Sequence, residues 1–193
     1  EDASMSVKNS YFPRMVLLET VYATGMPSNG FVIFEGNYFD GTTGYSDLIE
    51  FTGGKLPGPI VQFYNNTFAN GSDDGLDLDI TDAYVEGNVF VNFHRDDVRE
   101  SIACGVATDA GSVIHLVRNL FLNNDNGINL KNAGFMVSQN NTFIGCLEAA
   151  VVLGPLAGEG FDPARGAWIE GDVYWANNVI FQGNASGNSV TIT

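Results

Sequence analysis

Basic residues are scarce in this sequence. Eight Lys and Arg stand against 23 Asp and Glu among 193 residues, which gives a formal net charge of −15 at pH 7. Proteins that bind nucleic acid or anionic membrane surfaces use basic patches to neutralise phosphate. The charge balance therefore argues against both kinds of partner. It also argues against a polyanionic glycan, unless a cation bridges the two anions.

Cysteine is nearly absent as well. Cys104 and Cys146 lack the paired spacing of a zinc site. In the repeat described below they stand about two units apart, roughly 10 Å, which exceeds the limit of about 7 Å between the Cα atoms of a disulfide. We expect two small buried hydrophobic side chains rather than a bridge, so cysteine usage does not indicate a compartment.

Long apolar runs and helical periodicity are missing too. No stretch approaches the roughly 20 apolar residues of a membrane span. No segment sustains a period of 3.6 residues, which an amphipathic helix would show. Hydrophobic residues still make up 45% of the chain, with 14 Phe and 23 Gly. That content is enough for a good core, and we expect one all-β domain over residues 1–193.

What the sequence does contain is a repeated step, Asn-x-Phe. Its starts lie 27, 29, 22, 31, 22 and 37 residues apart along the chain. Short runs that alternate apolar and polar residues precede the steps, and such alternation is typical of half-buried strands. The steps, two of them degenerate, begin at Ser10, Asn37, Asn66, Asn88, Asn119, Asn141 and Asn178.

A unit of about 22 residues with strand-like alternation and no helix predicts a β-solenoid of about seven coils. Stacked coils bring like residues together about 4.8 Å apart. We therefore expect the Asn residues to form a ladder at one corner and the Phe residues to form a stack beneath it. Both are interpreted as structural groups rather than as a ligand site.

The order of these elements resembles a known family. The pattern G-[IL]-x-L, a short hydrophobic run and then N-x-F resembles the right-handed, single-stranded parallel β-helix repeat of pectate-lyase-like proteins. The stretch SDDGLDLDITDAYVEGN is similar to repeats of large secreted or surface-attached bacterial proteins. The resemblance implies a right-handed parallel β-helix. It does not imply one function, because this fold carries lyases, hydrolases, adhesins and spacers.

The strand that opens each unit carries acidic residues on its outer face. Alignment of the coils places Glu50 over Asp77, and Asp79 over Asp109, with Lys131 one coil further. Like charges about 5 Å apart repel, so either a cation lies among them or one carboxylate has a raised pKa. Carboxylate oxygens are hard ligands that suit Ca²⁺. The predicted Ca²⁺ ligands are Asp77, Asp79, Asp109, Glu50 and Asp74.

Two other interpretations of this acidic face remain open. It is a solvated surface that serves only solubility, or it is the active site of a polysaccharide lyase or glycoside hydrolase. A glycosidase needs two carboxylates about 5–10 Å apart, and a lyase needs a base beside a cation. The catalytic candidates are Asp77, Asp79, Asp109 and Lys131.

An insertion that follows Phe93 carries the basic side chains nearest to this face. It reads HRDDVRE and contains His94, Arg95 and Arg99. These three are candidate ligand-binding residues at the rim of the acidic face. Ion pairs with the acidic residues of the same loop explain them equally well.

The sequence as a whole predicts an extracellular or cell-envelope module that binds Ca²⁺ and, on the acidic face, a polysaccharide or a partner protein. The alternatives are the lyase or hydrolase named above and a structural spacer or assembly subunit. Because the chain shows no polar caps at its ends, we expect a segment of a longer chain, whose end coils dock onto further coils or neighbouring chains.

Overall fold

The computed structural model describes residues 4–95, 104–109, 112–130, 134–153, 172–181 and 188–192. Within these residues the chain forms strands and no helix, so it contains no helix long and apolar enough to cross a membrane. The strands belong to three sheets of seven strands each, and every pairing is parallel.

The three sheets are named A, B and C. Sheet A contains β1 (Met5–Lys8), β4 (Val32–Glu35), β7 (Val61–Tyr64), β10 (Ala83–Glu86), β13 (Val113–Val117), β16 (Phe135–Gln139) and β19 (Asp172–Ala176). Sheet B contains β2 (Tyr11–Phe12), β5 (Tyr38–Phe39), β8 (Thr67–Ala69), β11 (Val89–Val91), β14 (Leu120–Leu122), β17 (Thr142–Ile144) and β20 (Val179–Phe181). Sheet C contains β3 (Val21–Thr24), β6 (Ile49–Thr52), β9 (Leu76–Asp79), β12 (Cys104–Asp109), β15 (Asn126–Leu130), β18 (Ala149–Leu153) and β21 (Asn188–Ile192).

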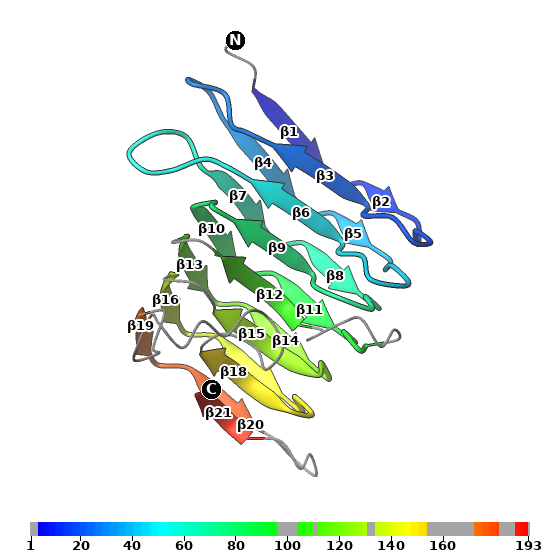
Figure 1. The fold of residues 1–193 in the computed structure, drawn as a ribbon, viewed down its shortest axis with the longest axis vertical. Helices are drawn as coiled ribbons and strands as arrows, with labels where there is room; N and C mark the ends of the chain where they lie inside the picture. The colour runs from blue at the N-terminus through cyan, green and yellow to red at the C-terminus, as the bar shows by residue number, and fades with distance from the viewer. Residues whose placement is uncertain are drawn as a thin grey trace, which may run out of the picture.

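The chain visits sheets A, B and C in turn, seven times. Each strand pairs with the strand three places before it and the strand three places after it, so sequence order runs down the stack (Figure 1). A parallel neighbour is thus always one whole repeat away in sequence. The described residues show an all-β fold of stacked parallel strands, and this arrangement is compatible with the predicted parallel β-helix.

The predicted alternation along the strands is confirmed. In β9, Leu76 and Leu78 are fully buried, while Asp77 and Asp79 are only half-buried. The same inward and outward alternation occurs in β4, β6, β7 and β10. The inward side chains of the three sheets pack into one apolar core.

An asparagine ladder connects the repeats at the corner between sheets A and B. The Asn66 Oδ1 atom accepts hydrogen bonds from the backbone nitrogen of Asn37 at 2.9 Å and from its Nδ2 atom at 3.0 Å. The Asn66 Nδ2 atom donates in turn to the Phe34 carbonyl at 3.0 Å. Ser10 and Asn178, the degenerate steps, stand at the two ends of the same ladder. The bonds continue through Asn88, Asn119 and Asn141.

A phenylalanine stack lies beside this ladder, inside the core. Neighbouring rings have centroids 4.4–5.0 Å apart and are tilted by at most 13°. The predicted ladder and the predicted stack are therefore both confirmed. The stack consists of Phe12, Phe39, Phe68, Phe90, Phe121 and Phe143.

A second internal ladder, built from hydroxyl groups, was not foreseen from the sequence. At the corner between sheets C and A, the Thr81 Oγ1 atom donates to the Phe51 carbonyl at 2.7 Å, and the Ser112 Oγ atom donates to the Leu78 carbonyl at 2.7 Å. The Thr81 backbone nitrogen donates to Ser112 Oγ at 3.0 Å. These bonds satisfy polar backbone groups that are out of reach of water.

The cysteines follow the expectation as far as the structure describes them. Cys146 is a free thiol with no exposed surface, and burial raises its pKa to about 12. It is a buried hydrophobic side chain and not a reactive thiolate. The side chain of Cys104 lies outside the described residues.

Replacing Asn88 by Ala is expected to lower the free energy of unfolding by about 1–3 kcal/mol, because the buried Asn66 nitrogen and Phe63 carbonyl in the preceding repeat lose their partner. Asn88 is 1% exposed and bonds to Asn66, Asn119 and the Phe63 carbonyl. Urea unfolding followed by circular dichroism measures the change. The control is Thr142→Ala on the outer face of β17, which should cost much less. Equal losses for the two variants would contradict the role given to the ladder.

Candidate metal centre

Acidic residues gather where the chain enters sheet C in two consecutive repeats. Asp47 stands just before β6, Asp74 stands just before β9, and Asp77 lies within β9. The two turns are joined by hydrogen bonds. The Leu48 backbone nitrogen donates to the Asp74 carbonyl at 2.9 Å, and the Asp74 backbone nitrogen donates to Asp47 Oδ1 at 2.9 Å. The parallel pairing of β6 with β9 therefore fixes the three carboxylates relative to one another.

The three side chains form a compact set of oxygen ligands, named here the aspartate cluster: Asp47, Asp74 and Asp77. One carboxylate oxygen from each lies within 4.8 Å of the others. Two oxygens bound to the same Ca²⁺, each about 2.3–2.6 Å from it, are at most about 5.2 Å apart. The aspartate cluster can therefore hold a metal ion as it stands. Asp74 is 7% exposed, and Asp47 and Asp77 are half-buried.

Burial and the neighbouring carboxylates both disfavour the ionised form of Asp47 in the aspartate cluster. Burial is the main cause that raises the pKa of Asp47 well above its usual range, and the charges of Asp74, Asp77 and Asp73 raise it further. The hydrogen bond from the Asp74 amide acts in the opposite direction. Glu50, further along the same face, also has a raised pKa, through burial and then through Glu19 and Asp79. The site favours either a proton or a cation.

The structure reproduces the stacking expected for the outer face of sheet C. Glu50 pairs in register with Asp77, and Asp79 pairs with Asp109. Of the five predicted metal ligands, Asp74 and Asp77 belong to the aspartate cluster. Glu50 and Asp79 lie further along the face and are not part of the cluster that the described residues form.

Asp47 is the member of the cluster that the sequence-based alignment missed. That alignment considered only the strand residues, whereas Asp47 precedes its strand. The signal was present nevertheless. Ile49 pairs with Leu76, and the same register carried two residues back places Asp47 beside Asp74. An acidic residue two positions before the first inward side chain, in two adjacent repeats, is the pattern that would have identified it.

Some candidate residues fall partly or wholly outside the described part of the chain. Asp109 is described in its backbone only, and Lys131 and Arg99 are not described. The proposed catalytic set therefore reduces, among described side chains, to Asp77 and Asp79. Asp79 pairs with Thr52 on its other side.

His94 and Arg95 begin a second network at the same corner between sheets B and C, in the repeat that follows Asp74. The His94 Nδ1 atom lies 2.7 Å from Asp125 Oδ1, and the Arg95 backbone nitrogen donates to Asp125 Oδ2 at 3.0 Å. The Arg95 guanidinium forms an ion pair with Glu148, whose Oε2 atom accepts from Asn126 Nδ2 at 3.0 Å. These contacts tie three successive repeats together. The described contacts of His94 and Arg95 are thus with neighbouring repeats.

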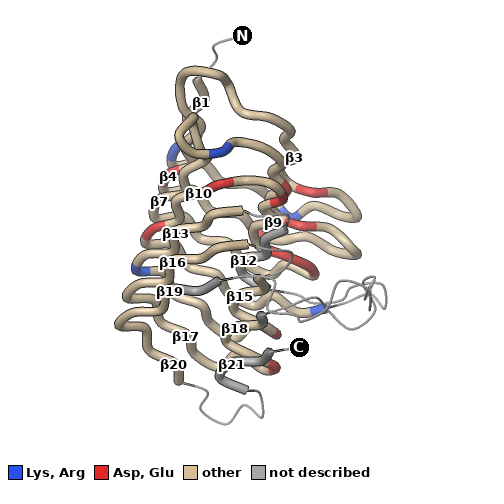
Figure 2. The backbone as a smooth tube through the Cα atoms, turned by 60° about the vertical axis from the view of Figure 1, so that its left-hand side comes forward, with Lys and Arg blue, Asp and Glu red and all other residues tan. Residues whose placement is uncertain are grey.

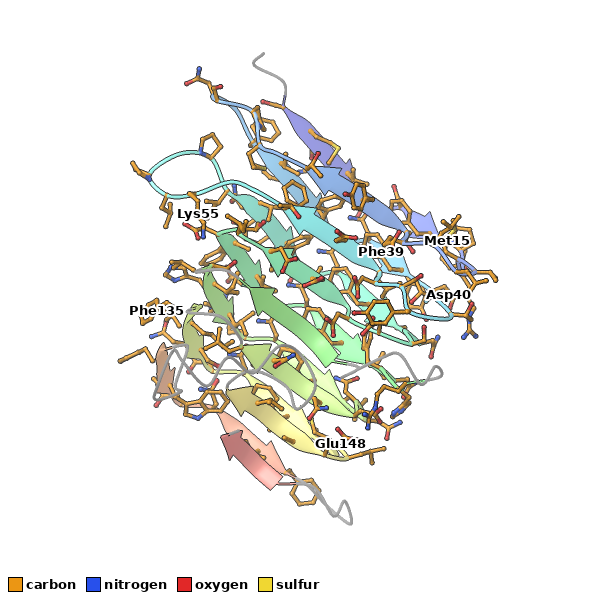
Figure 3. All side chains as sticks on the ribbon, in the orientation of Figure 1. Met15, Phe39, Asp40, Lys55, Phe135 and Glu148 are labelled. Atoms are coloured by element: carbon orange, nitrogen blue, oxygen red, sulfur yellow. The ribbon has the colours of Figure 1, made fainter. Side chains whose placement is uncertain are left out.

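Labelled side chains mark two opposite edges of the molecule (Figure 3). Asp40 and Glu148 lie at the edge of the molecule where sheets B and C meet, and Lys55 and Phe135 lie at the opposite edge (Figure 3). Lys55 pairs there with the buried Asp82, whose Oδ2 atom accepts from the Leu56 backbone nitrogen at 2.8 Å. This carboxylate anchors the loop between β6 and β7 and is not available as a ligand.

Comparison with protein-family models, curated proteins and solved structures gives no match for this chain. The geometry of the aspartate cluster therefore carries the functional argument.

The raised pKa of Asp47 leads to a prediction for the metal-free protein. Because its folded-state pKa lies above the unfolded value of about 3.9, the ionised carboxylate destabilises the fold. Stability should therefore rise as pH falls through the folded-state pKa, and the gain should be complete below the unfolded pKa. Asp47→Asn, which keeps the oxygen that accepts from Asp74, should flatten this dependence and raise stability at neutral pH. Urea unfolding at a series of pH values in EDTA measures it. A wild-type slope in the variant would contradict a raised pKa of Asp47.

Proposed function

We propose that this protein is a divalent-cation-binding module whose aspartate cluster takes up Ca²⁺ and, through it, holds a polysaccharide or a partner protein. The observation that carries the proposal is the approach of three carboxylate oxygens to within 4.8 Å. At neutral pH such an approach is unfavourable without a counter-ion. A bound dication would turn the repulsion into attraction.

Ligand chemistry favours Ca²⁺ over transition metals. All three groups are carboxylates, and the cluster includes neither the His nor the Cys that zinc and copper sites prefer. Ca²⁺ accepts six to eight oxygen ligands in flexible geometry, so three Asp side chains leave several positions open. Those positions can take the oxygens of a ligand. A cation in the cluster would allow a chain of net charge −15 to hold an acidic glycan or an acidic partner surface.

We further propose that the stacked sheets form a single right-handed parallel β-helix of about seven coils, pectate-lyase-like in its repeat. The sequential visits to sheets A, B and C support a helical path. An extracellular or cell-envelope location fits this proposal, because Ca²⁺ sites of moderate affinity are filled at the higher Ca²⁺ concentrations outside cells. A role as a polysaccharide lyase or hydrolase is the alternative for the same face.

Addition of Ca²⁺ to metal-free protein at neutral pH is expected to raise the melting temperature, because a ligand that binds only the folded state stabilises it. Asp74→Asn should shrink this shift strongly, since it removes a charged ligand from the centre of the cluster. Asp79→Asn should leave most of the shift, because Asp79 lies outside the aspartate cluster. Glu148→Gln is the control, as it removes one negative charge at the same corner but three repeats beyond Asp74.

Differential scanning calorimetry with and without EDTA, followed by calorimetric titration with Ca²⁺, measures these effects. Equal melting temperatures for wild type in EDTA and in Ca²⁺ would leave the cluster as a solvated acidic surface. If Asp79→Asn abolishes the Ca²⁺-induced shift and Asp74→Asn keeps it, the ion binds on the outer face of β9 and not in the aspartate cluster. Release of unsaturated or reducing ends from an acidic polysaccharide in Ca²⁺ would favour the enzymatic alternative.

A further inference from the structure

The outer face of sheet A has a chemistry unlike that of the acidic face of sheet C. Its middle strands present aromatic and amide side chains, named here the tyrosine face: Gln62, Tyr64, Tyr84 and His115. Tyr84 pairs in register with Gln62 on one side and with His115 on the other. All four side chains are half-buried and belong to β7, β10 and β13.

The rings of the tyrosine face are held in place by one another. Tyr84 stacks with His115 at a centroid separation of 6.2 Å, and it lies 5.9 Å from the ring of Tyr64. The Tyr64 hydroxyl donates to Gln62 Oε1 at 2.6 Å. This bond uses the amide oxygen of Gln62 and not its nitrogen, whose hydrogens can donate to a ligand. Side chains already fixed in this way lose little conformational entropy on binding a ligand. The tyrosine face is thus preorganised.

The charges around the tyrosine face compensate each other. The Lys8 Nζ atom lies 2.7 Å from Glu35 Oε2, and Arg118 forms an ion pair with Glu86. Acidic residues gather instead on the side of the molecule where β3 and β9 lie, and the side with β13 and β16 carries few charged residues (Figure 2). A polyanion would be repelled by the net charge of −15, and a cationic partner would be drawn to the acidic side. The ligand suited to the tyrosine face is uncharged.

The residue types point to a sugar. A pyranose ring offers an apolar C–H surface that packs on an aromatic ring, together with hydroxyl groups that both donate and accept hydrogen bonds. Tyr64, Tyr84 and His115 supply ring surfaces with polar tips, and Gln62 supplies amide donors. Gln62, Tyr84 and His115 lie in register on neighbouring strands, which are about 4.8 Å apart. A linear sugar chain that crosses these strands therefore meets one of these side chains after another.

We propose that the tyrosine face binds an uncharged linear oligosaccharide, which runs across β7, β10 and β13. This binding is independent of the aspartate cluster and of Ca²⁺, so it stands whether or not the proposed cation site does. A protein partner is the competing occupant, because tyrosine is also enriched in protein interfaces. The test below separates the two.

The test is a calorimetric titration in EDTA with linear hexasaccharides of glucose, xylose, mannose and N-acetylglucosamine. At least one is expected to bind the wild type with a Kd of about 1 mM or tighter. Tyr84→Ala should weaken that binding by about tenfold or more, in line with the weight of an aromatic anchor. Tyr84→Phe, which keeps the ring, should weaken it less. Tyr22→Ala is the matched control, because Tyr22 is an exposed tyrosine on β3 of sheet C, where it pairs with Glu50.

Several results would overturn the proposal. These are the absence of binding by all four sugars to the wild type, equal loss in Tyr84→Ala and Tyr22→Ala, and loss of sugar binding in Asp74→Asn. Self-association of the wild type that Tyr84→Ala abolishes, without sugar binding, would instead make the tyrosine face a protein interface. Melting temperatures of the variants, read beside the titrations, distinguish loss of the site from loss of the fold. Failure of Ca²⁺ to stabilise the protein would leave the result in EDTA unaffected.

Discussion

Parallel pairing between residues one whole repeat apart is the constraint on which the rest of this structure depends. Such pairing brings each residue beside its equivalent in the next repeat. A side chain at such a position must therefore stack well on the equivalent side chain of the next repeat. At the corner between sheets A and B, asparagine meets this demand because one amide both donates and accepts. Its Oδ1 atom accepts from a backbone nitrogen of the preceding repeat, and its Nδ2 atom donates to a carbonyl of that repeat. Asn66 bonds to Asn37 and Phe34 in this way.

The same constraint makes it unfavourable for a charged residue to recur at equivalent positions of consecutive repeats. Where a carboxylate recurs in consecutive repeats, the sheet holds two like charges at the spacing of its strands, and the side chains cannot move apart without breaking the register. Asp47 and Asp74 are in this position, and the charge of Asp74 adds to the effect of burial in raising the pKa of Asp47. Glu50 beside Asp77 and Asp79 beside Asp109 repeat this arrangement along sheet C. On sheet A, by contrast, neighbouring strands pair opposite charges, as Lys8 does with Glu35. Among the described residues, the approach of three carboxylate oxygens to within 4.8 Å distinguishes the aspartate cluster from the rest of this acidic face.

The sequence predicts well those features that depend on equivalent positions, and poorly those that depend on the loops. The Asn-x-Phe step identifies the ladder and the stack because each strand residue has one equivalent per repeat. It also sets the register that places Glu50 beside Asp77. Asp47 was missed because it lies in a connection, where repeats differ in length and equivalence has to be extended from the strand. The hydroxyl ladder of Thr81 and Ser112 was missed because two different residues fill equivalent places. The partners of His94 belong to other repeats, and no sequence pattern near His94 predicts them.

The alternation of side chains along each strand allows the faces of this molecule to differ in chemistry while the core stays the same. Inward positions repeat the same apolar types in every sheet, and outward positions are free of that requirement. In β9 the outward residues are Asp77 and Asp79, and in β10 they are Tyr84 and Glu86, although both strands bury two apolar side chains. A change on one outer face therefore leaves the ladders and the other faces intact. For the same reason, the two sites proposed above, on sheet A and at the entry to sheet C, would be independent of each other.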